Sequence, residues 1–261
     1  MSSQQDGGRQ TVESLVAEAR LAKGDARAAN RILPLVDLTS LGGSESEADI
    51  EALCRRAVEH DVAAVCIYDR HLRQARVLLA GSGVALATVV AFPEGGDDIL
   101  KAADDSAAAV ADGADEIDVV APLQAAMSGD IGLVGELVES CRAAVGPNVA
   151  IKLILETGTL ADGALITAVA RSAVMAGVDF LKTSTGKVPV GATLEAAALL
   201  LAVIQEAEGR VGLKLSGGVR TTGDAAAYLA MVDRVMGEDW ARKGRLRFGA
   251  SSLLDDLLAR R

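Results

Sequence analysis

Lys182 is the residue of this 261-residue chain whose type and position most directly suggest covalent chemistry. It ends Val178–Lys182, a run typical of a short buried strand, and a polar turn, Thr183–Lys187, follows it. In parallel α/β folds, ligands bind at the carboxyl ends of the strands. A lysine held there among apolar neighbours is more readily neutral, and the neutral amine attacks carbonyl carbons. Taken alone, this stretch is equally consistent with a lysine that has no chemical role and extends from the strand end into water.

Further charged residues interrupt segments that are otherwise typical of apolar strands. Because a buried charge persists only when it is paired, these acids and lysines must pair with one another. Their pairing fits either a set of structural salt bridges or a reactive centre, and the excess of lysines over acids favours the reactive centre. The residues, with the strands expected to carry them, are Asp37 in Leu33–Asp37, Asp118 in Glu116–Val120, Lys152 in Ala150–Leu155 and Lys214 in Gly212–Leu215.

Crowding of the lysines would make Lys182 a better nucleophile. A second ammonium group nearby disfavours protonation, and lowering a lysine pKa from about 10.4 to about 7 corresponds to roughly 4–5 kcal/mol. Burial and a like charge together supply a shift of this size. Lys214 on the next strand is the expected neighbouring cation, and Asp118 or Asp37 is the expected proton shuttle.

Two glycine-containing turns follow the last two predicted strands and suit a phosphate group. Small residues there expose backbone N–H groups, and the helix that begins after each turn adds its positive end. Phosphate sites in barrels of eight strand–helix units often lie after strands seven and eight. Thr185-Gly186-Lys187 resembles the end of a nucleotide-binding loop, but Leu181 stands where that motif needs glycine. The two turns are Ser216–Arg220, with Gly217 and Gly218, and Phe248–Ser252, with Gly249, Ser251 and Ser252.

A repeating unit positions these residues: a short apolar strand, a polar turn and an alanine-rich amphipathic helix. Eight such units follow one another without a linker, which predicts an α/β fold, a (β/α)8 TIM barrel forming a single domain over 31–261. A doubly wound open sheet is the alternative, but the turn after the first strand, Thr39–Gly43, lacks its glycine fingerprint. Before the barrel we expect a disordered leader at 1–10 and an N-terminal helical extension at 11–30. The other predicted strands are Ala63–Tyr68, Ala85–Val90, Phe180–Thr183 and Arg245–Phe248.

The bulk composition narrows the range of partners. Hydrophobic residues make up 50% and aromatic residues 2% of the chain, so the core must be built from Ala, Val, Leu and Ile. The formal charge of −10 argues against nucleic acid and anionic membranes as main partners. No apolar run is long enough for a membrane helix, and the first ten residues lack a signal-peptide core. Three cysteines at unrelated spacings suggest a reducing, cytoplasmic location.

Few residues are suited to bind a metal ion. The only two histidines, His60 and His71, flank predicted helices away from the strand ends, and we expect both at the surface. A zinc-dependent enzyme on this scaffold normally needs more imidazoles. Cys66, late in the second predicted strand, is expected to line the core or the pocket. We therefore expect neither a metal ion nor another cofactor.

Several separate motifs together resemble deoxyribose-phosphate aldolase, a family of class I aldolases. The resemblance runs from about Ile32 to Leu258, and the order and spacing of the motifs make it specific. Leu215-Ser216 departs from the proline- or alanine-containing pair that often follows the second lysine in the family. The chain also ends at Arg261 without the tyrosine-ended tail of some members, so the sequence does not support a contribution of such a tail to proton transfer. The motifs are Asp37-Leu38-Thr39, Val65–Tyr68, Phe92–Gly95, Gly113–Val120, Lys152 with Glu156-Thr157-Gly158, Phe180–Lys187, Lys214–Arg220 and Arg247–Ser252.

The resemblance implies a (β/α)8 barrel in which Lys182 forms a Schiff base while Asp118 and Lys214 relay protons. It implies reversible cleavage of 2-deoxy-D-ribose 5-phosphate to D-glyceraldehyde 3-phosphate and acetaldehyde, without a cofactor. The expected partners are these small molecules and other copies of the chain, in a homodimer or higher homo-oligomer. The residues expected to contact the substrate are Asp37, Cys66, Lys152, Thr185, Gly186, Lys187, Gly217, Gly218, Gly249, Ser251 and Ser252.

Three other functions remain open from the sequence alone. A transaldolase-like aldolase that acts on another sugar phosphate would be recognised by product analysis with 2-deoxyribose 5-phosphate. A metal-dependent barrel lyase would lose its activity in a chelator. A non-catalytic barrel that binds sugar phosphates would hold the substrate without turning it over.

Overall fold

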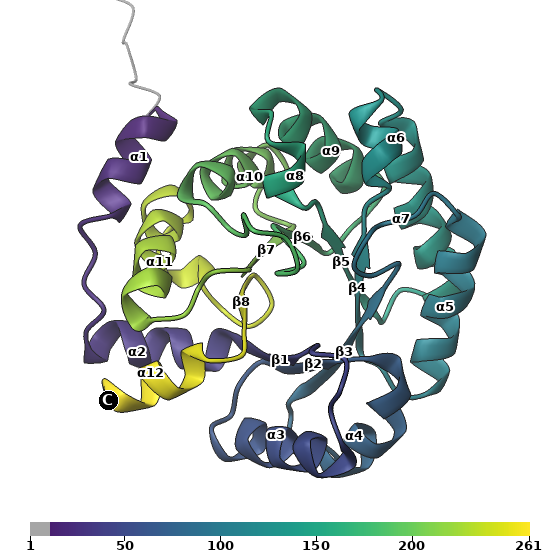
Figure 1. Ribbon diagram of the computed structural model, residues 1–261. Coiled ribbons are helices and arrows are strands. Elements are labelled where there is room, and N and C mark those ends of the chain that lie inside the picture. Colours follow the sequence, from purple (N-terminus) through teal and green to yellow (C-terminus); the bar gives the residue numbers. More distant parts are fainter. Residues whose placement is uncertain (1–10) are drawn as a thin grey trace, which may run out of the picture.

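The computed structural model describes residues 11–261, and eight parallel strands within them form a closed barrel (Figure 1). Each strand pairs with the next, and β8 pairs with β1, so the sheet has no free edge. The predicted (β/α)8 barrel is confirmed, and the open doubly wound alternative is wrong. The strands are β1 Val36–Ser40, β2 Ala64–Ile67, β3 Ala85–Val90, β4 Glu116–Val120, β5 Ala150–Ile154, β6 Phe180–Lys182, β7 Gly212–Ser216 and β8 Leu246–Ala250.

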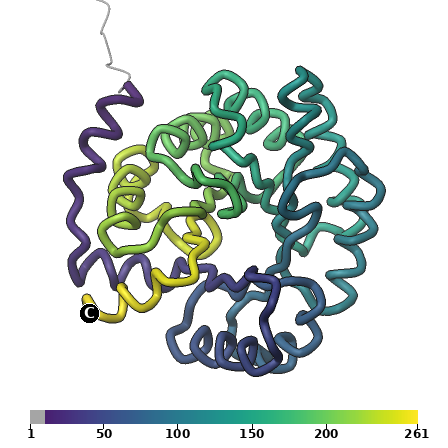
Figure 2. The backbone as a smooth tube through the Cα atoms, in the orientation of Figure 1, coloured from purple at the N-terminus to yellow at the C-terminus, as the bar shows by residue number. Residues whose placement is uncertain are grey.

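Helices connect successive strands on the outside of the barrel, as the tube in Figure 2 also shows. Several begin at a side chain that accepts a hydrogen bond from a backbone N–H three residues on, namely Ser46, Asp98, Asp162, Thr193 and Thr221. None of the helices between residues 11 and 261 has the length and the apolar run that crossing a bilayer would need. The connecting helices are α3 Glu47–Glu59, α4 Leu72–Leu78, α5 Ile99–Ala111, α6 Leu123–Met127, α7 Gly132–Val145, α8 Thr157–Leu160, α9 Gly163–Met175, α10 Leu194–Glu206 and α11 Thr222–Met236, and α12 Leu253–Ala259 follows the last strand.

The N-terminal extension is helical but divided, in contrast to the single helix expected at 11–30. Helices α1 (Val12–Ala19) and α2 (Ala26–Ile32) lie outside the barrel, against α10, α11 and α12 (Figure 1). The chain bends between them because Gly24 packs against α11, where an added Cβ would lie 2.5 Å from the Gly223 nitrogen. Asp25 then starts α2 by accepting a hydrogen bond from its first turn. The leader expected at 1–10 lies outside the described residues.

The first strand begins later than the sequence predicts. Leu33–Leu35, expected to be part of the strand, form a 3-10 turn, and β1 follows it. Pro34 explains the difference, because proline has a fixed φ and no N–H to donate within a sheet. Asp37 is consequently the second residue of β1 and not the last, and its side chain is fully buried inside the barrel.

The strand register determines which side chains share the inside of the barrel. Asp118 of β4 pairs with Lys152 of β5, and Lys182 of β6 pairs with Lys214 of β7. Since side chains alternate between the two faces of a sheet, Glu116 points to the same side as Asp118. The opposite face, between the strands and the helices, is filled by Leu, Ile, Val and Ala side chains. The polar interior is thus enclosed by an apolar layer.

A glycine in β7 makes room for an aromatic ring in this interior. An added Cβ at Gly212 would lie 2.4 Å from the Phe180 ring and 2.9 Å from the carbonyl oxygen of Arg245. The ring in turn lies against the Arg247 guanidinium, whose central carbon is 5.6 Å from the ring centre. Gly212 therefore fixes the place of the ring beside the charged side chains of the barrel.

We expect Gly212→Ala to destabilise the protein by about 1–3 kcal/mol, because the new methyl group overpacks the Phe180 ring. Urea unfolding followed by circular dichroism measures the change. Gly96→Ala is the matched control, since an added Cβ there meets no atom within 4 Å, and it should change the free energy of unfolding by less than about 0.5 kcal/mol. Equal stability of the two variants would show that the ring moves aside without cost.

Candidate active site

Seven charged side chains meet inside the barrel, and none is more than 8% exposed. They come from six different strands, and three are carboxylates while four are cations. The five charged residues singled out in the sequence are all among them. The cluster consists of Asp37 (β1), Glu116 and Asp118 (β4), Lys152 (β5), Lys182 (β6), Lys214 (β7) and Arg247 (β8).

Asp118 is the centre of this cluster, because three ammonium groups surround its carboxylate. Lys152 donates to Oδ1 at 2.7 Å, and Lys182 and Lys214 both donate to Oδ2 at 2.7 Å. The three lysines come from the consecutive strands β5, β6 and β7, whose parallel register brings their Nζ atoms to one acid. The structure thus places the predicted nucleophile, its neighbouring cation and the predicted acid in direct contact.

Two members of the cluster, Glu116 and Arg247, are not among the site residues predicted from the sequence. Arg247 bridges two acids, with N–O distances of 2.6 Å to Asp37 and 2.7 Å to Glu116. Those acids in turn hold two of the lysines, since Asp37 lies 2.6 Å from Lys214 Nζ and Glu116 lies 2.6 Å from Lys152 Nζ. Strand alternation is the signal that identifies Glu116, because a residue two positions from a buried charge points to the same side.

The three lysines have different pKa values because their surroundings differ. Burial lowers the pKa of Lys182, and together with the positive charge of Lys214 it outweighs the opposite effect of Asp118. Burial acts on Lys214 too, but Asp118 and Asp37 outweigh it and raise the pKa of Lys214 above its usual range. The pKa of Lys152 is also raised, because the nearby acids outweigh burial. Lys182 is therefore the most readily neutral amine of the three.

With every group ionised, the cluster holds four positive charges and three negative ones. Loss of the proton from Lys182 leaves three of each, so the neutral amine balances the buried interior. Burial raises the pKa of Asp118, but the three lysines outweigh it and hold this pKa well below its usual range. The arrangement combines an amine of lowered pKa, a carboxylate of lowered pKa and an ammonium group of raised pKa, which suit the nucleophile, proton acceptor and proton donor that imine chemistry needs.

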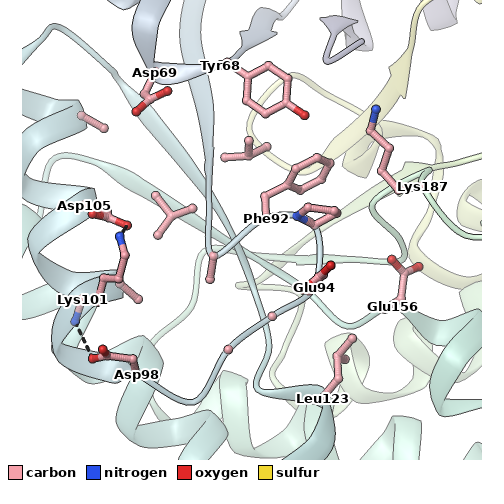
Figure 3. Close-up of a pocket in the computed structure, with 18 of the residues that line it drawn as sticks. Tyr68, Asp69, Phe92, Glu94, Asp98, Lys101, Asp105, Leu123, Glu156 and Lys187 are labelled. Carbon is pink, nitrogen blue, oxygen red and sulfur yellow. Dashed lines mark hydrogen bonds and ion pairs between the residues drawn. The ribbon is translucent and has the colours of Figure 1, made fainter. Parts of the chain in front are cut away.

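A cavity of about 1120 Å³ lies between helix α5 and the loops that follow β2 to β6 (Figure 3). The residues that line it do not include a member of the charged cluster. Tyr68 and Phe92 line it with rings that meet edge to face, with 6.1 Å between their centres. Glu156 and Lys187 line it from the loops that follow β5 and β6. The two rings also pack against a small apolar group that contains Cys66. Burial raises the pKa of the Cys66 thiol, so this residue is a neutral apolar side chain between the cavity wall and the lysines.

The two turns expected to hold a phosphate are neighbours, since Ser216 and Gly249 are partners in the register of β7 and β8. Gly217 and Gly218 both have a positive φ, 80° and 91°, which favours glycine. An added Cβ at Gly217 would lie 2.9 Å from the Cα of Gly191, whereas one at Gly218 would meet no atom within 4 Å. Gly217 is therefore needed for packing, and Gly218 is the position where a ligand can approach the backbone.

The second predicted turn, Phe248–Ser252, is largely strand in the structure, because β8 continues to Ala250 and includes Gly249. Gly249 leaves room for the Lys214 side chain, because an added Cβ would lie 3.1 Å from the lysine Cε. Ser251 and Ser252 are exposed just before α12. Gly249 thus accommodates the charged cluster, and the two serines are the residues of this turn that face solvent.

The loop after β6 is attached to its neighbours by side-chain hydrogen bonds. Thr185 Oγ1 donates to Glu156 Oε2 and accepts a hydrogen bond from the Lys187 N–H at 3.0 Å. Lys187 Nζ donates to the carbonyl oxygen of Leu41, in the loop after β1. Gly186 is exposed and has a positive φ of 78°. These contacts place the Lys187 ammonium group at the wall of the cavity (Figure 3).

The histidines are placed only partly as expected. His60 is half-buried at the end of α3, but His71 is buried and accepts a hydrogen bond from the Arg70 side chain. The expectation that His71 lies at the surface is wrong, because the 3-10 turn Asp69–His71 folds the chain back onto the barrel before α4. Among residues 11–261, no group of three or more His, Cys, Asp and Glu side chains is arranged to hold a metal ion.

Comparisons with known proteins agree with this geometry. Residues 31–259 match the sequence model of a family described as DeoC/LacD family aldolase. A candidate deoxyribose-phosphate aldolase from Toxoplasma gondii ME49 has the same fold, with 23% identity and a TM-score of 0.82 over 90% of this chain and 94% of that chain. A candidate deoxyribose-phosphate aldolase from Coccidioides immitis is 26% identical, with a TM-score of 0.80 over 95% of this chain and 96% of that chain.

A third solved structure, the deoxyribose phosphate aldolase from Aeropyrum pernix, is described as a unique tetramer. It is 22% identical, with a TM-score of 0.75 over 95% of this chain and 97% of that chain. The family match begins before β1 and ends within α12, so it includes every strand and all seven members of the charged cluster. On this match, the chain belongs to the DeoC/LacD family of aldolases.

Proposed function

We propose that the protein is a class I aldolase that reversibly cleaves 2-deoxy-D-ribose 5-phosphate to D-glyceraldehyde 3-phosphate and acetaldehyde, through a Schiff base on Lys182. The observation that carries this proposal is the contact of Lys182 and Lys214 with one carboxylate oxygen of Asp118, each at 2.7 Å. Lys182 has a lowered pKa and ends β6 at the mouth of the barrel. Membership of an aldolase family supports the class of reaction.

The reaction begins when the neutral amine of Lys182 adds to the C1 aldehyde. The adduct then takes up a proton and loses water, which gives an iminium ion. The C3 hydroxyl then loses its proton, the C2–C3 bond breaks, and its electron pair enters the iminium group to form an enamine. D-glyceraldehyde 3-phosphate, made of C3 to C5, departs. Protonation of the enamine at C2 and hydrolysis of the imine release acetaldehyde and restore the amine. Burial favours the neutral amine that the first step requires.

Asp118 and Lys214 are proposed to move the protons of this sequence. The Asp118 carboxylate contacts both Lys182 and Lys214, so it is placed to pass a proton between the reacting nitrogen and the second lysine. Lys214 lies beside Asp118 and Asp37, which raise its pKa, and its positive charge helps to lower the pKa of Lys182. Acid–base groups positioned in this way accelerate reactions by about 10²–10⁴-fold.

The phosphate is proposed to bind at Gly218 and at the turn that carries Ser251 and Ser252, with Lys187 lending positive charge. The open space at Gly218 supports this placement, because an anion needs close access to backbone N–H groups. The site must act locally, since the whole chain has a formal charge of −10. Binding energy at the phosphate positions the reacting carbons, so it should raise the rate as well as the affinity.

We also propose that the protein forms a homo-oligomer and works in the cytoplasm. The Aeropyrum pernix relative is described as tetrameric, which is consistent with this proposal. The three cysteines are buried free thiols, as suits a reducing compartment.

Borohydride reduction in the presence of acetaldehyde should add one ethyl group to Lys182, because reduction of the imine fixes the two-carbon aldehyde to the amine. Peptide mass spectrometry locates the group, and Lys182→Ala should abolish it. Product analysis with 2-deoxyribose 5-phosphate then identifies the two aldehydes released. An ethyl group on Lys152, Lys187 or Lys214 would assign the nucleophile to another lysine.

Lys214→Met should lower the rate of cleavage by about 10²–10⁴-fold and move imine formation to higher pH. The positive charge of Lys214 lowers the pKa of Lys182, so its removal raises that pKa, and a higher pH is needed for the neutral amine. The pH profile of borohydride trapping measures the shift. Circular dichroism must accompany it, because Asp37 and Asp118 lose a buried partner. A folded variant with the normal rate and profile would exclude Lys214 from the mechanism.

Gly218→Val should slow the cleavage of 2-deoxyribose 5-phosphate far more than that of 2-deoxyribose, because a side chain blocks the approach of the phosphate to the backbone. Gly237→Val is the matched control for backbone strain. Gly237 has a similar φ of 86° and equally open surroundings, but it lies in the turn after α11. Steady-state kinetics on both sugars measure the effect, and equal slowing of the two by Gly218→Val would place the phosphate elsewhere.

A further inference from the structure

Glu156 lines the cavity but has no role in the reaction proposed above. It lies two residues after the end of β5, and the residues on either side of it are hydrogen-bonded to the segment that carries Lys182. The Leu155 N–H donates to the carbonyl oxygen of Lys182, and the Thr157 N–H donates to that of Thr183, each at 2.9 Å. The backbone of Glu156 is left-handed, with a φ of 51°, which is uncommon for any residue but glycine. Such a strained residue at a cavity suggests that its side chain is needed there.

The two carboxylate oxygens of Glu156 have different surroundings. Oε2 accepts hydrogen bonds from the N–H of Thr185, at 3.2 Å, and from its hydroxyl group. The hydroxyl hydrogen is donated to Oε2, and the hydroxyl oxygen also accepts a hydrogen bond from the Lys187 N–H. Oε1 is buried and has no hydrogen-bond partner among residues 11–261, although Glu156 as a whole is only 1% exposed. A buried acceptor without a partner costs free energy, so Oε1 is placed to receive a donor from outside the chain.

The chemistry of this donor is restricted by the carboxylate. Glu156 stands in the wall of the cavity, across from Phe92 (Figure 3). A carboxylate only accepts hydrogen bonds, so an aldehyde oxygen offers it nothing, and a phosphate group is repelled by its charge. A hydroxyl group of a sugar supplies the missing donor. The subsite at Glu156 therefore fits the polyol part of a substrate and not its phosphate.

We propose that Glu156 Oε1 binds the C4 hydroxyl of the sugar phosphate. In the synthetic direction this hydroxyl belongs to the three-carbon aldehyde, on the carbon next to the carbonyl carbon, so Glu156 selects an aldehyde that carries it. This inference rests on the proposed function. In 2-deoxyribose 5-phosphate, C1 is joined to Lys182, the C3 hydroxyl gives up its proton during cleavage, and C5 carries the phosphate. The C4 hydroxyl is the donor that remains. Thr185 then acts as a positioning residue, because it holds the other carboxylate oxygen in place.

The test compares two acceptor aldehydes in the synthetic direction with acetaldehyde as the donor. One is D-glyceraldehyde 3-phosphate, and the other is 3-oxopropyl phosphate, which lacks the hydroxyl group. In the test variant Glu156→Gly, glycine adopts the left-handed backbone without strain. The ratio of kcat/KM for the hydroxylated aldehyde to kcat/KM for the other aldehyde should fall by about 10- to 100-fold, because the variant loses a hydrogen bond to a charged group. Glu156→Gln keeps an oxygen for Thr185 and should give an intermediate preference.

Glu208→Gly is the matched control, since Glu208 is an exposed glutamate with a similar left-handed φ of 56° in the turn after α10. Its preference between the aldehydes should equal that of the unmodified protein. Loss of the Thr185 contact in Glu156→Gly slows both aldehydes alike, so it cancels in the ratio. An unchanged ratio in Glu156→Gly, with normal acetaldehyde trapping on Lys182, would overturn this inference and leave the proposed function intact. Absence of trapping in the unmodified protein would overturn both.

Discussion

The contact of three lysine ammonium groups with the single carboxylate of Asp118 is the interaction on which the rest of the barrel depends. Removing an ion from water costs several kcal/mol, and only close opposite charges offset this cost. The strand register places the lysines at hydrogen-bonding distance, and Arg247 holds the remaining acids, Asp37 and Glu116, on the other side of the cluster. One excess positive charge remains. Lys182 can remove it by losing its proton, so the reactivity of that amine follows from the charge balance of the whole interior.

The fold could be predicted because apolar strands between polar turns leave a clear pattern in the sequence. β3 and β4 have the predicted bounds, Ala85–Val90 and Glu116–Val120. The prediction failed where local chemistry overrides that pattern. Pro34 belongs to an apolar run but cannot donate to a sheet, so it moves the start of β1. The N-terminal extension bends where Gly24 meets α11, and a contact between segments so distant in the chain has no local signal.

The charged cluster could be predicted where a charge interrupts or ends an apolar run. Asp118 and Lys214 stand out in this way, and both lie beside Lys182. Arg247 does not stand out, because a charged residue near the start of a strand is commonly exposed to solvent. A glycine near a strand end is equally ambiguous, since Gly249 of β8 makes room for a lysine side chain although the sequence predicts a phosphate-binding turn there. The roles assigned to these residues in the reaction stay predictions.

Closure of the barrel by its last strand has a consequence for synthesis on the ribosome. Asp37 is translated early, but its partner Arg247 comes 210 residues later, and β1 cannot pair with β8 before that strand exists. Until then the nascent chain has an open sheet edge at β1 and an acid that must stay hydrated, because an unpaired buried carboxylate is costly. We therefore expect the growing polypeptide to remain incompletely compacted until its C-terminal segment emerges. For that period it depends on solvent, or on a chaperone, to protect surfaces that the finished barrel encloses.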